Sequence, residues 1–411
     1  MKGERLLLAS LALSVVLVGT LVGACTSAPA AGVEKPPLKI GMSTPSTGVA
    51  AEKGAPMGHA NLDAIRYINE ELGGIDGHKI EVLWLDNSYD AAKAATIIKR
   101  FIDEDCLFFT TASSGMMTAM MELANREAFP GFAAFSSPNL TQPPQHIYGQ
   151  TPDYGDDWAA FAKYYLENIW KGPGKPRMAL HLLNNSVGAG ARKAAEALAD
   201  ELGIEIVAIE EHTPTTTSEN ESLTRIKALE PDVLYISSTP APTAVIIKNA
   251  VELGMYPGTT IALGHAGMTK ALVDLAGADV VEGVYGVYPT VNWGEDVPGM
   301  AKMTEYVRKY HPDDEGNSDY IISWAQSLIA AEILRLAVQN AGGAERLTPQ
   351  MVEELGFKKL KDYDVEGLHG PVSYTPGDNR LSKSVRVLQV QNGQLVPITG
   401  WIEAPFIDYS Q

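Results

Sequence analysis

Apolar residues recur along this chain with two periodicities that alternate with each other. Short continuous apolar runs are typical of buried strands, and apolar residues at every third or fourth position are typical of helices. Strands that alternate with helices predict a doubly wound parallel sheet. In the first part of the chain the predicted strands are Leu38–Met42, Lys79–Leu85, Cys106–Phe109 and Gly131–Phe135, and the predicted helices are Ala55–Leu72, Ala91–Asp103 and Met116–Ala124.

The same alternation starts again near residue 158, which predicts a second α/β lobe of similar design. Its predicted helices are Trp158–Trp170, Ala189–Leu202, Leu223–Leu229 and Pro242–Leu253, and its predicted strands are Arg177–Leu183, Glu205–Ile209, Asp232–Ile236 and Thr260–Leu263.

The last part of the chain has a different character. Three helices are predicted first, at Met300–Tyr310, Tyr320–Gln339 and Pro349–Leu355. Two alternating segments, Val372–Tyr374 and Val385–Val390, then predict strands, and an Asn392-Gly393 turn follows them. This pattern favours a hairpin-like edge added to one lobe over a third domain.

Composition agrees with a folded protein of two or more domains. The 411 residues are 45% hydrophobic and 20% charged, and the formal net charge is −18. A chain this acidic, without a basic cluster, is not expected to bind nucleic acid.

The first 25 residues predict an export signal rather than part of the fold. Lys2 and Arg5 form a basic start, Leu6–Val22 is apolar, and small residues lead into Cys25. This end resembles the lipobox of bacterial lipoproteins, in which the cysteine is acylated. Residues 26–37 would then be a Pro/Ala-rich tether that holds an extracytoplasmic protein at the membrane. A plain transmembrane anchor is the alternative, and the shortness of the apolar run disfavours it.

The cysteine count limits the possible chemistry further. If Cys25 is acylated, Cys106 is the only thiol left. A disulfide framework and a cysteine-based metal site are then excluded.

A loop of small residues joins the predicted strand Cys106–Phe109 to the helix at Met116. Ser113 and Ser114 stand at the start of that helix, where unpaired backbone N–H groups can hold an anion or a polar ligand oxygen. In parallel α/β sheets such a loop lies beyond the carboxyl ends of the strands, where ligands bind. The alternative is an ordinary serine cap without a ligand.

Motifs for catalysis and cofactors are missing from the sequence. It contains no Walker loop, no HExxH and no Gly-x-Ser-x-Gly, and Gly188-Ala189-Gly190 lacks the third glycine of a dinucleotide loop. We therefore expect no catalytic residue, no cofactor and no metal.

Several segments resemble a known family. Leu38–Gly54 (LKIGMSTPSTGVAAEKG), Tyr67–Gly77 (YINEELGGIDG) and Ser136–Thr141 (SSPNLT) resemble type I periplasmic binding proteins of the branched-chain amino acid class. The likeness runs from about Leu38 to the C-terminus. It implies two lobes joined by three crossovers, a ligand held between the lobes, and an ABC permease as the membrane partner.

The resemblance also implies lobe boundaries. Crossovers are expected near Thr151–Tyr154, Tyr285–Thr290 and Asp364–Gly370. Lobe 1 would then contain residues 38–152 and 288–365, and lobe 2 residues 153–287 and 366–411.

When the family's binding positions are compared with this sequence residue by residue, only some of them are retained. Those that hold the ligand carboxylate fall on Ser113, Ser114, Ala134 and Ser136. A family aromatic falls on Lys53, which would favour an anion if it lines the cleft, although an exposed lysine is an equal alternative. Two family tyrosines fall on Val187 and near Thr239-Pro240, so these hydrogen-bonding partners are missing.

The acidic partner of the α-ammonium group is missing as well. Its position falls near Gly264-His265-Ala266-Gly267, where the sequence has no carboxylate. Burying an ammonium without a partner costs about several kcal/mol, so an α-amino acid is disfavoured as the ligand. His265 could donate to a second polar group or simply end a strand.

Aromatic residues could form the rest of the pocket. Tyr154 lies near a crossover, and Tyr320 and Trp324 lie four residues apart on one helix face, where they wall a pocket or belong to the core. The sequence thus predicts an extracytoplasmic receptor of an ABC importer for a small organic anion with an apolar or aromatic body. The alternatives are a branched-chain amino acid or amide receptor, a ligand sensor without transport, and a secreted enzyme.

Overall fold

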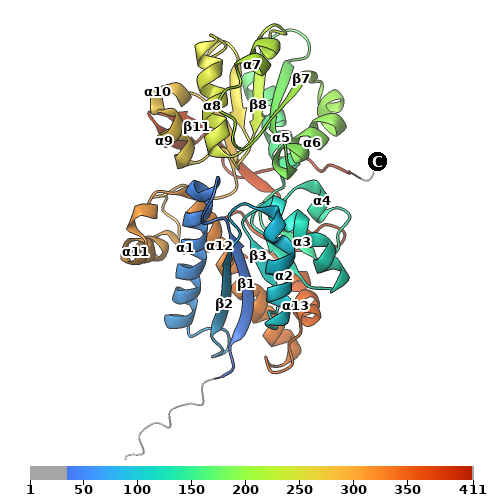
Figure 1. Cartoon of the computed structure of the whole chain (residues 1–411), viewed down its shortest axis with the longest axis vertical. Helices are drawn as coiled ribbons and strands as arrows, with labels where there is room; N and C mark the ends of the chain where they lie inside the picture. The colour runs from blue at the N-terminus through green and yellow to red at the C-terminus, as the bar shows by residue number, and fades with distance from the viewer. Residues whose placement is uncertain (1–34, 410–411) are drawn as a thin grey trace, which may run out of the picture. The chain divides into compact units, whose positions relative to one another are not determined.

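Two β-sheets organise residues 35–409, the part of the chain that the computed structural model describes (Figure 1). The first sheet has five parallel strands in the order β2-β1-β3-β4-β5. Its strands are β1 (Leu38–Thr44), β2 (Ile80–Asp86), β3 (Phe109–Thr111), β4 (Gly131–Ala133) and β5 (Ile147–Gly149). Non-consecutive neighbours in this order require helical crossovers, as in a doubly wound sheet.

Helices cover both faces of the first sheet, and each face has its own apolar core. The helices of this lobe are α1 (Ala51–Glu70), α2 (Ala94–Asp103), α3 (Ser114–Arg126), α4 (Pro138–Thr141), α11 (Met300–Tyr310), α12 (Ser318–Ala341) and α13 (Pro349–Leu355). On one face Leu38, Ile40 and Met42 of β1 pack in a cluster with residues of α1, α11 and α12. On the other face, Gly41 lets the Phe101 ring of α2 approach, because a Cβ there would lie 2.5 Å from the ring.

The second sheet is mixed. Its main path runs β12-β11-β10-β9-β8-β6-β7, with β13 paired to β11. Its strands are β6 (Arg177–Leu183), β7 (Glu205–His212), β8 (Val233–Ser237), β9 (Thr260–Leu263), β10 (Tyr285–Tyr288), β11 (Ser384–Gln391), β12 (Gln394–Pro397) and β13 (Ile402–Glu403). Strands β6 to β10 are parallel, whereas β11 runs antiparallel to β10 and forms a hairpin with β12 through Asn392-Gly393. The predicted strand Val385–Val390 and the Asn392-Gly393 turn are therefore present, but the strand that pairs across the turn is β12 and not the predicted Val372–Tyr374.

Helices also flank the second sheet on both faces. They are α5 (Tyr154–Tyr164), α6 (Ser186–Leu202), α7 (Asn220–Lys227), α8 (Pro240–Glu252), α9 (Lys270–Ala276) and α10 (Ala278–Val281). Residues of α5 and α6 pack with Leu180 of β6 on one face, and residues of α7 to α10 pack with Ala179 on the other. Neighbouring strand residues point to opposite faces, which separates these two cores.

The packing of residues 366–381 favours a third crossover later in the chain than the sequence resemblance implied. Leu368, Val372 and Leu381 belong to the same apolar cluster as β1, and Leu381 N–H donates to the carbonyl of Gly149 in β5 (2.8 Å). The second sheet is joined only at Ser384, where β11 begins. We therefore propose that residues 366–381 belong to lobe 1 and that the chain crosses between 382 and 384.

Three predicted elements differ from the structure. The strand expected at Cys106–Phe109 begins at Phe109, although Leu107 N–H already donates to Lys39 O. Val372–Tyr374 is not a strand and makes one isolated bridge, Tyr363 to Val372. The loop expected at 136–144 contains α4, and β5 was not predicted because three residues are too short for an alternating pattern.

One helix in the described part of the chain is long and apolar enough to cross a membrane, judged by length and composition. It is α12, and 83% of its most apolar window is buried inside the protein. The expected signal peptide, Cys25 and most of the expected tether lie outside the described residues.

Candidate functional site

A small cavity lies where elements of the two lobes meet. Its volume is about 20 Å³, room for about one water molecule. Fourteen residues line it: Pro45, Ala50, Lys53, Gly54, Met57, Tyr89, Ala112, Ser113, Ser114, Phe135, Tyr154, Val187, Thr239 and Ala266. They come from the loops beyond the carboxyl ends of parallel strands in both sheets, where α/β proteins bind ligands.

Four helices begin at this cavity. Lys53 lies in the first turn of α1, Ser113 is the N-cap of α3, Val187 is the second residue of α6, and Thr239 is the N-cap of α8. Each helix start carries a partial positive charge, but not all of them offer free N–H groups: Pro240 and Pro242 of α8 have none, and the N-caps Ser113 and Asn185 each already accept one N–H. Together they make the cavity favourable for a negative group.

Ser114 joins the two lobes at the cavity. Its Oγ lies 2.9 Å from Ser186 Oγ, at the first residue of α6, and 3.2 Å from the Tyr154 hydroxyl. Ser113 accepts a hydrogen bond from Met116 N–H (3.2 Å) and so caps α3. Burial raises the pKa of Tyr154, which keeps its hydroxyl protonated and able to donate.

The other half of the expected carboxylate site does not border the cavity. Ala134 uses its backbone within the lobe, since its N–H donates to Thr111 O and its carbonyl accepts from Thr151 Oγ1. Ser136 is fully buried, and its Oγ has no hydrogen-bond partner among the described residues. Its backbone carbonyl accepts from Tyr154 N–H (3.2 Å), at the start of α5.

The expectation that Lys53 supplies a free positive charge is wrong. Lys53 does line the cavity, but its Nζ donates to Oδ1 of Asp319, the second residue of α12, and both side chains are buried. Tyr288 Oη donates to the same oxygen (3.2 Å). Asp319 is 266 positions away in the sequence, so no local pattern could indicate this pairing.

A carboxylate does lie beside the Gly264–Gly267 segment, contrary to the sequence expectation. Oδ2 of Asp157 in α5 accepts from the backbone N–H of His265 (3.0 Å) and lies 2.7 Å from its Nδ1. Both side chains are fully buried. The His265 ring stacks against Phe135 and Tyr154, with ring centroids 4.9 and 5.1 Å apart. Because this carboxylate lies beside the segment, an amino acid ligand is less disfavoured than the sequence indicated.

Tyr320 and Trp324 do not wall the pocket as proposed. Both are fully buried in the core of the first lobe, where Trp324 stacks on Tyr67 and meets the edge of Tyr306, each at 5.7 Å. Tyr320 Oη donates to Oδ2 of Asp63 in α1 (2.9 Å). Their spacing on one helix face reflects packing of α12 on α1.

Two aromatic residues of the cavity were not predicted. Tyr89 follows β2 and has a positive φ of 58°, and its hydroxyl accepts from Asn185 Nδ2 (3.2 Å), the N-cap of α6. Phe135 directly precedes Ser136, and Lys53 Nζ lies 4.4 Å from its ring centroid. The positions of these two residues just after β2 and β4 could have indicated that they line the cavity. Close by, burial raises the pKa of Glu52, which has one buried oxygen without a partner among the described residues.

Within residues 35–409, no group of three or more His, Cys, Asp and Glu side chains is arranged to hold a metal ion. The candidate site is therefore described by its hydroxyls, helix starts and apolar walls alone.

Comparison with known proteins identifies the family. The family model described as "Periplasmic binding protein" matches residues 37–394. This chain belongs to that family. It has the type I, branched-chain amino acid transporter-like form, whose members are solute-binding receptors and not enzymes, and the family places the receptor outside the cytoplasm.

Three proteins are similar to this chain over most of its length. A Pseudomonas aeruginosa "Amino acid binding protein" is 25% identical over 341 residues, which is 80% of this chain and 86% of that protein. A Thermus thermophilus structure of a branched-chain amino acid ABC transporter with bound valine aligns with a TM-score of 0.81 at 21% identity, covering 90% and 97% of the two chains. A fatty acid ABC transporter substrate-binding protein from Thermomonospora curvata aligns with a TM-score of 0.79 at 19% identity, covering 90% and 94%.

Proposed function

We propose that this receptor serves an ABC importer and captures a small organic carboxylate with an apolar or aromatic body by closing its lobes. A ligand that contacts both lobes favours the closed state, because only closure brings the two halves of the site together. The observation that carries the proposal is the meeting of four helix starts and the Ser114 hydroxyl at one cavity.

The walls of the cavity support the apolar part of the ligand. Met57, Phe135 and Val187 offer carbon surface, and the charge of Lys53 is offset by Asp319. The carboxylate would bind Ser114 and the helix starts, and the body would pack against these side chains. Because the cavity has room for about one water molecule, the lobes must part from this arrangement to admit the body. The two ligands named for relatives, valine and fatty acids, share a carboxylate group and an aliphatic body.

A thermal-shift screen tests this ligand class. The panel pairs each carboxylate with its uncharged amide (benzoate with benzamide, hexanoate with hexanamide), and adds succinate, valine and leucine. A true ligand at about 100 times its Kd stabilises the folded state by about 2.7 kcal/mol. We expect a shift with a carboxylate and none with its amide. A shift with the amides but not with the acids would contradict the proposal.

Substituting Ser114 tests the location of the site. Ser114→Ala should weaken binding of the best acid about tenfold or more, because a hydrogen bond to a charged group contributes about 1.5–3 kcal/mol. Ser323→Ala is the matched control, since Ser323 is buried in α12 and does not line the cavity. Equal affinities for the two variants would remove Ser114 from the site.

An amino acid receptor is the second candidate, and one specific observation favours it. Asp157 lies beside His265, in the segment on which the sequence resemblance places the family's partner for the ligand ammonium. A shift with valine or leucine that exceeds the shift with isovalerate would favour this candidate over the simple carboxylate. The sensor alternative differs only in its partner, because a sensor would not depend on a permease for its role.

We also propose that Cys25 carries a lipid anchor, as the lipobox-like end of residues 1–25 indicates. In a bacterial host, Cys25→Ser should move the protein from the membrane fraction to the soluble extracytoplasmic fraction. Retention of the variant in the membrane would instead support a plain transmembrane anchor.

A further inference from the structure

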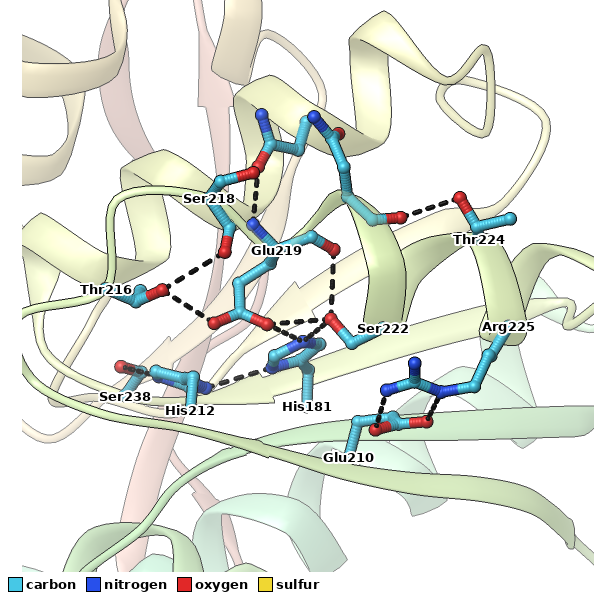
Figure 2. Close-up of polar contacts among 12 residues, drawn as sticks. His181, Glu210, His212, Thr216, Ser218, Glu219, Ser222, Thr224, Arg225 and Ser238 are labelled. Carbon is cyan, nitrogen blue, oxygen red and sulfur yellow. Dashed lines mark hydrogen bonds and ion pairs between the residues drawn. The ribbon is translucent and has the colours of Figure 1, made fainter.

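A continuous chain of hydrogen bonds runs through the second lobe (Figure 2). It ends at Ser238, next to the lining residue Thr239. At its centre are two buried imidazoles, His181 in β6 and His212 at the end of β7. Their Nδ1 atoms lie 2.9 Å apart and face each other. Only one of the two nitrogens can carry the shared hydrogen, because two N–H groups would repel and two lone pairs would not bond.

The outer nitrogens of the pair are also engaged. His181 Nε2 lies 2.9 Å from Ser222 Oγ in α7, and His212 Nε2 lies 2.7 Å from Ser238 Oγ, just after β8. Ser222 Oγ donates to Glu219, whose Oε2 lies 2.7 Å away and whose backbone carbonyl oxygen lies 2.9 Å away, and Thr216 Oγ1 donates to Oε1 (2.7 Å). The Glu219 side chain is 12% exposed, so this end of the chain is the one that meets solvent.

The carboxylate sets the direction of every bond in the chain, because an ionised carboxylate can only accept. Ser222 uses its hydrogen on Glu219, so its oxygen must accept from His181 Nε2–H. His181 Nδ1 is then an acceptor and receives the hydrogen of His212 Nδ1. His212 Nε2 must in turn accept from the Ser238 hydroxyl. The structure thus assigns the Nε2–H tautomer to His181 and the Nδ1–H tautomer to His212.

We propose that this chain is a proton-sensitive switch, in which neutralising Glu219 reverses the bonds and turns the Ser238 hydroxyl away from His212. In the reversed state the Glu219 carboxyl donates to the Ser222 oxygen, and the Ser222 hydroxyl donates to His181 Nε2. His181 Nδ1–H then donates to His212 Nδ1, and His212 Nε2–H donates to the Ser238 oxygen. One proton is gained in total, and it resides on the Glu219 carboxyl. Both imidazoles stay neutral in either direction, so reversal buries no net charge.

The charged groups around the pair leave Glu219 as the group that controls it. Glu210 of β7 lies opposite His181 in the strand register. Arg225 of α7 donates to both carboxylate oxygens of Glu210 (2.8 Å each). Burial lowers the pKa of His181 to about 4 and that of His212 to about 3. The rings are therefore neutral at neutral pH, as the directed chain requires.

The far end of the switch adjoins the ligand loops. Ser238 precedes Thr239, which lines the cavity, and a Cβ on Gly267 would lie 3.0 Å from the Ser238 carbonyl oxygen. Gly267 follows Ala266, another lining residue. Reversal would therefore change the hydrogen bonding of Ser238, which lies next to both loops. This consequence for binding rests on the proposed function, whereas the switch itself can be tested without a ligand.

Long-range ¹H–¹⁵N NMR of the histidine rings at neutral pH provides the test. We expect the Nε2–H tautomer for His181 and the Nδ1–H tautomer for His212 in the native protein. In Glu219→Gln, whose amide can donate to Ser222, we expect both tautomers to change together, with a shift of the Thr239 backbone amide. Either native tautomer found opposite to this assignment would overturn the proposal.

Two controls separate the switch from general disturbance. Glu221→Gln removes an exposed carboxylate two residues away and should change neither ring. His369, whose Nδ1 donates to the carbonyl of Gly370 (2.7 Å), should keep its tautomer in every sample. If Glu219→Gln does not fold, the tautomers of the native protein at neutral pH still test the assignment. Unchanged His181 and His212 tautomers in a folded Glu219→Gln would refute the switch.

Discussion

At the scale of single residues, a lysine beside a cavity attracts an anion only if no carboxylate reaches its ammonium first. Asp319 does reach Lys53, and the pair is shielded from water on both sides, with side chains 8% and 0% exposed. Removing one member leaves a buried charge without a partner, which typically costs about 3–5 kcal/mol. The pair is thus a structural element of the cavity wall more than a source of charge.

Lys53→Met should therefore lower the free energy of unfolding by about 3–5 kcal/mol, measured by urea denaturation at neutral pH. In Lys53→Met combined with Asp319→Leu, most of this loss should be recovered, because no unpaired charge remains. Lys99→Met is the control: its pair with Asp103 is exposed on both sides, and we expect a change within about 0.5 kcal/mol. Equal losses from Lys53→Met and Lys99→Met would show that burial does not govern the pair.

At the scale of elements, most of the architecture could be predicted from local pattern. The alternation of strands and helices, the helix start at Ser113 and the Asn392-Gly393 turn all follow from short-range sequence signals, whereas the helix predicted from Ala189 begins at Ser186. The contacts Lys53–Asp319 and Asp157–His265 could not be predicted, because they join residues 266 and 108 positions apart. Sequence spacing also could not tell which face of α12 meets the pocket, since that helix is apolar nearly all round.

Trp324→Ala tests the placement of α12 in the core. The indole is fully buried against Tyr67 and Tyr306, so we expect a loss of about 3–5 kcal/mol in unfolding free energy. The affinity of the folded fraction for its ligand should not change. Trp401→Ala, at a side chain 37% exposed, should cost about 1 kcal/mol or less. A large loss of affinity with little loss of stability would return Trp324 to the site.

At the scale of the whole molecule, the segment at the second crossover is paired with residues 368–369, which pack with lobe 1. Thr290 and His369 form an isolated antiparallel bridge, and Val291 N–H donates to Leu368 O (3.0 Å). His369 is buried there, and burial lowers its pKa from 6.5 to about 4. The charge state of this ring therefore affects the stability of the pairing beside the second crossover.

The sign of the pH effect follows from these two values. Below about pH 6.5 the unfolded chain binds a proton at His369 that the folded protein does not bind, so stability falls as the pH drops toward about 4. His369→Gln removes this proton uptake. Between about pH 6.5 and pH 4, the free energy of unfolding of the native protein should fall by about 2–3 kcal/mol more than that of the variant, as measured by urea denaturation. Parallel stability curves for the two proteins would contradict the assignment.

The contact between Ser114 and Ser186 has a consequence for the rate at which the receptor exchanges its cargo. Their oxygens lie 2.9 Å apart on helices of different lobes, so cysteines at both positions would be placed to form a covalent clasp. The native thiol Cys106 would not interfere, because burial raises its pKa to about 12 and keeps it unreactive. In Ser114→Cys combined with Ser186→Cys, oxidation should slow ligand dissociation many-fold, and reductant should restore it. If oxidation does not change the rate of ligand dissociation, the ligand leaves without separation of the two helices.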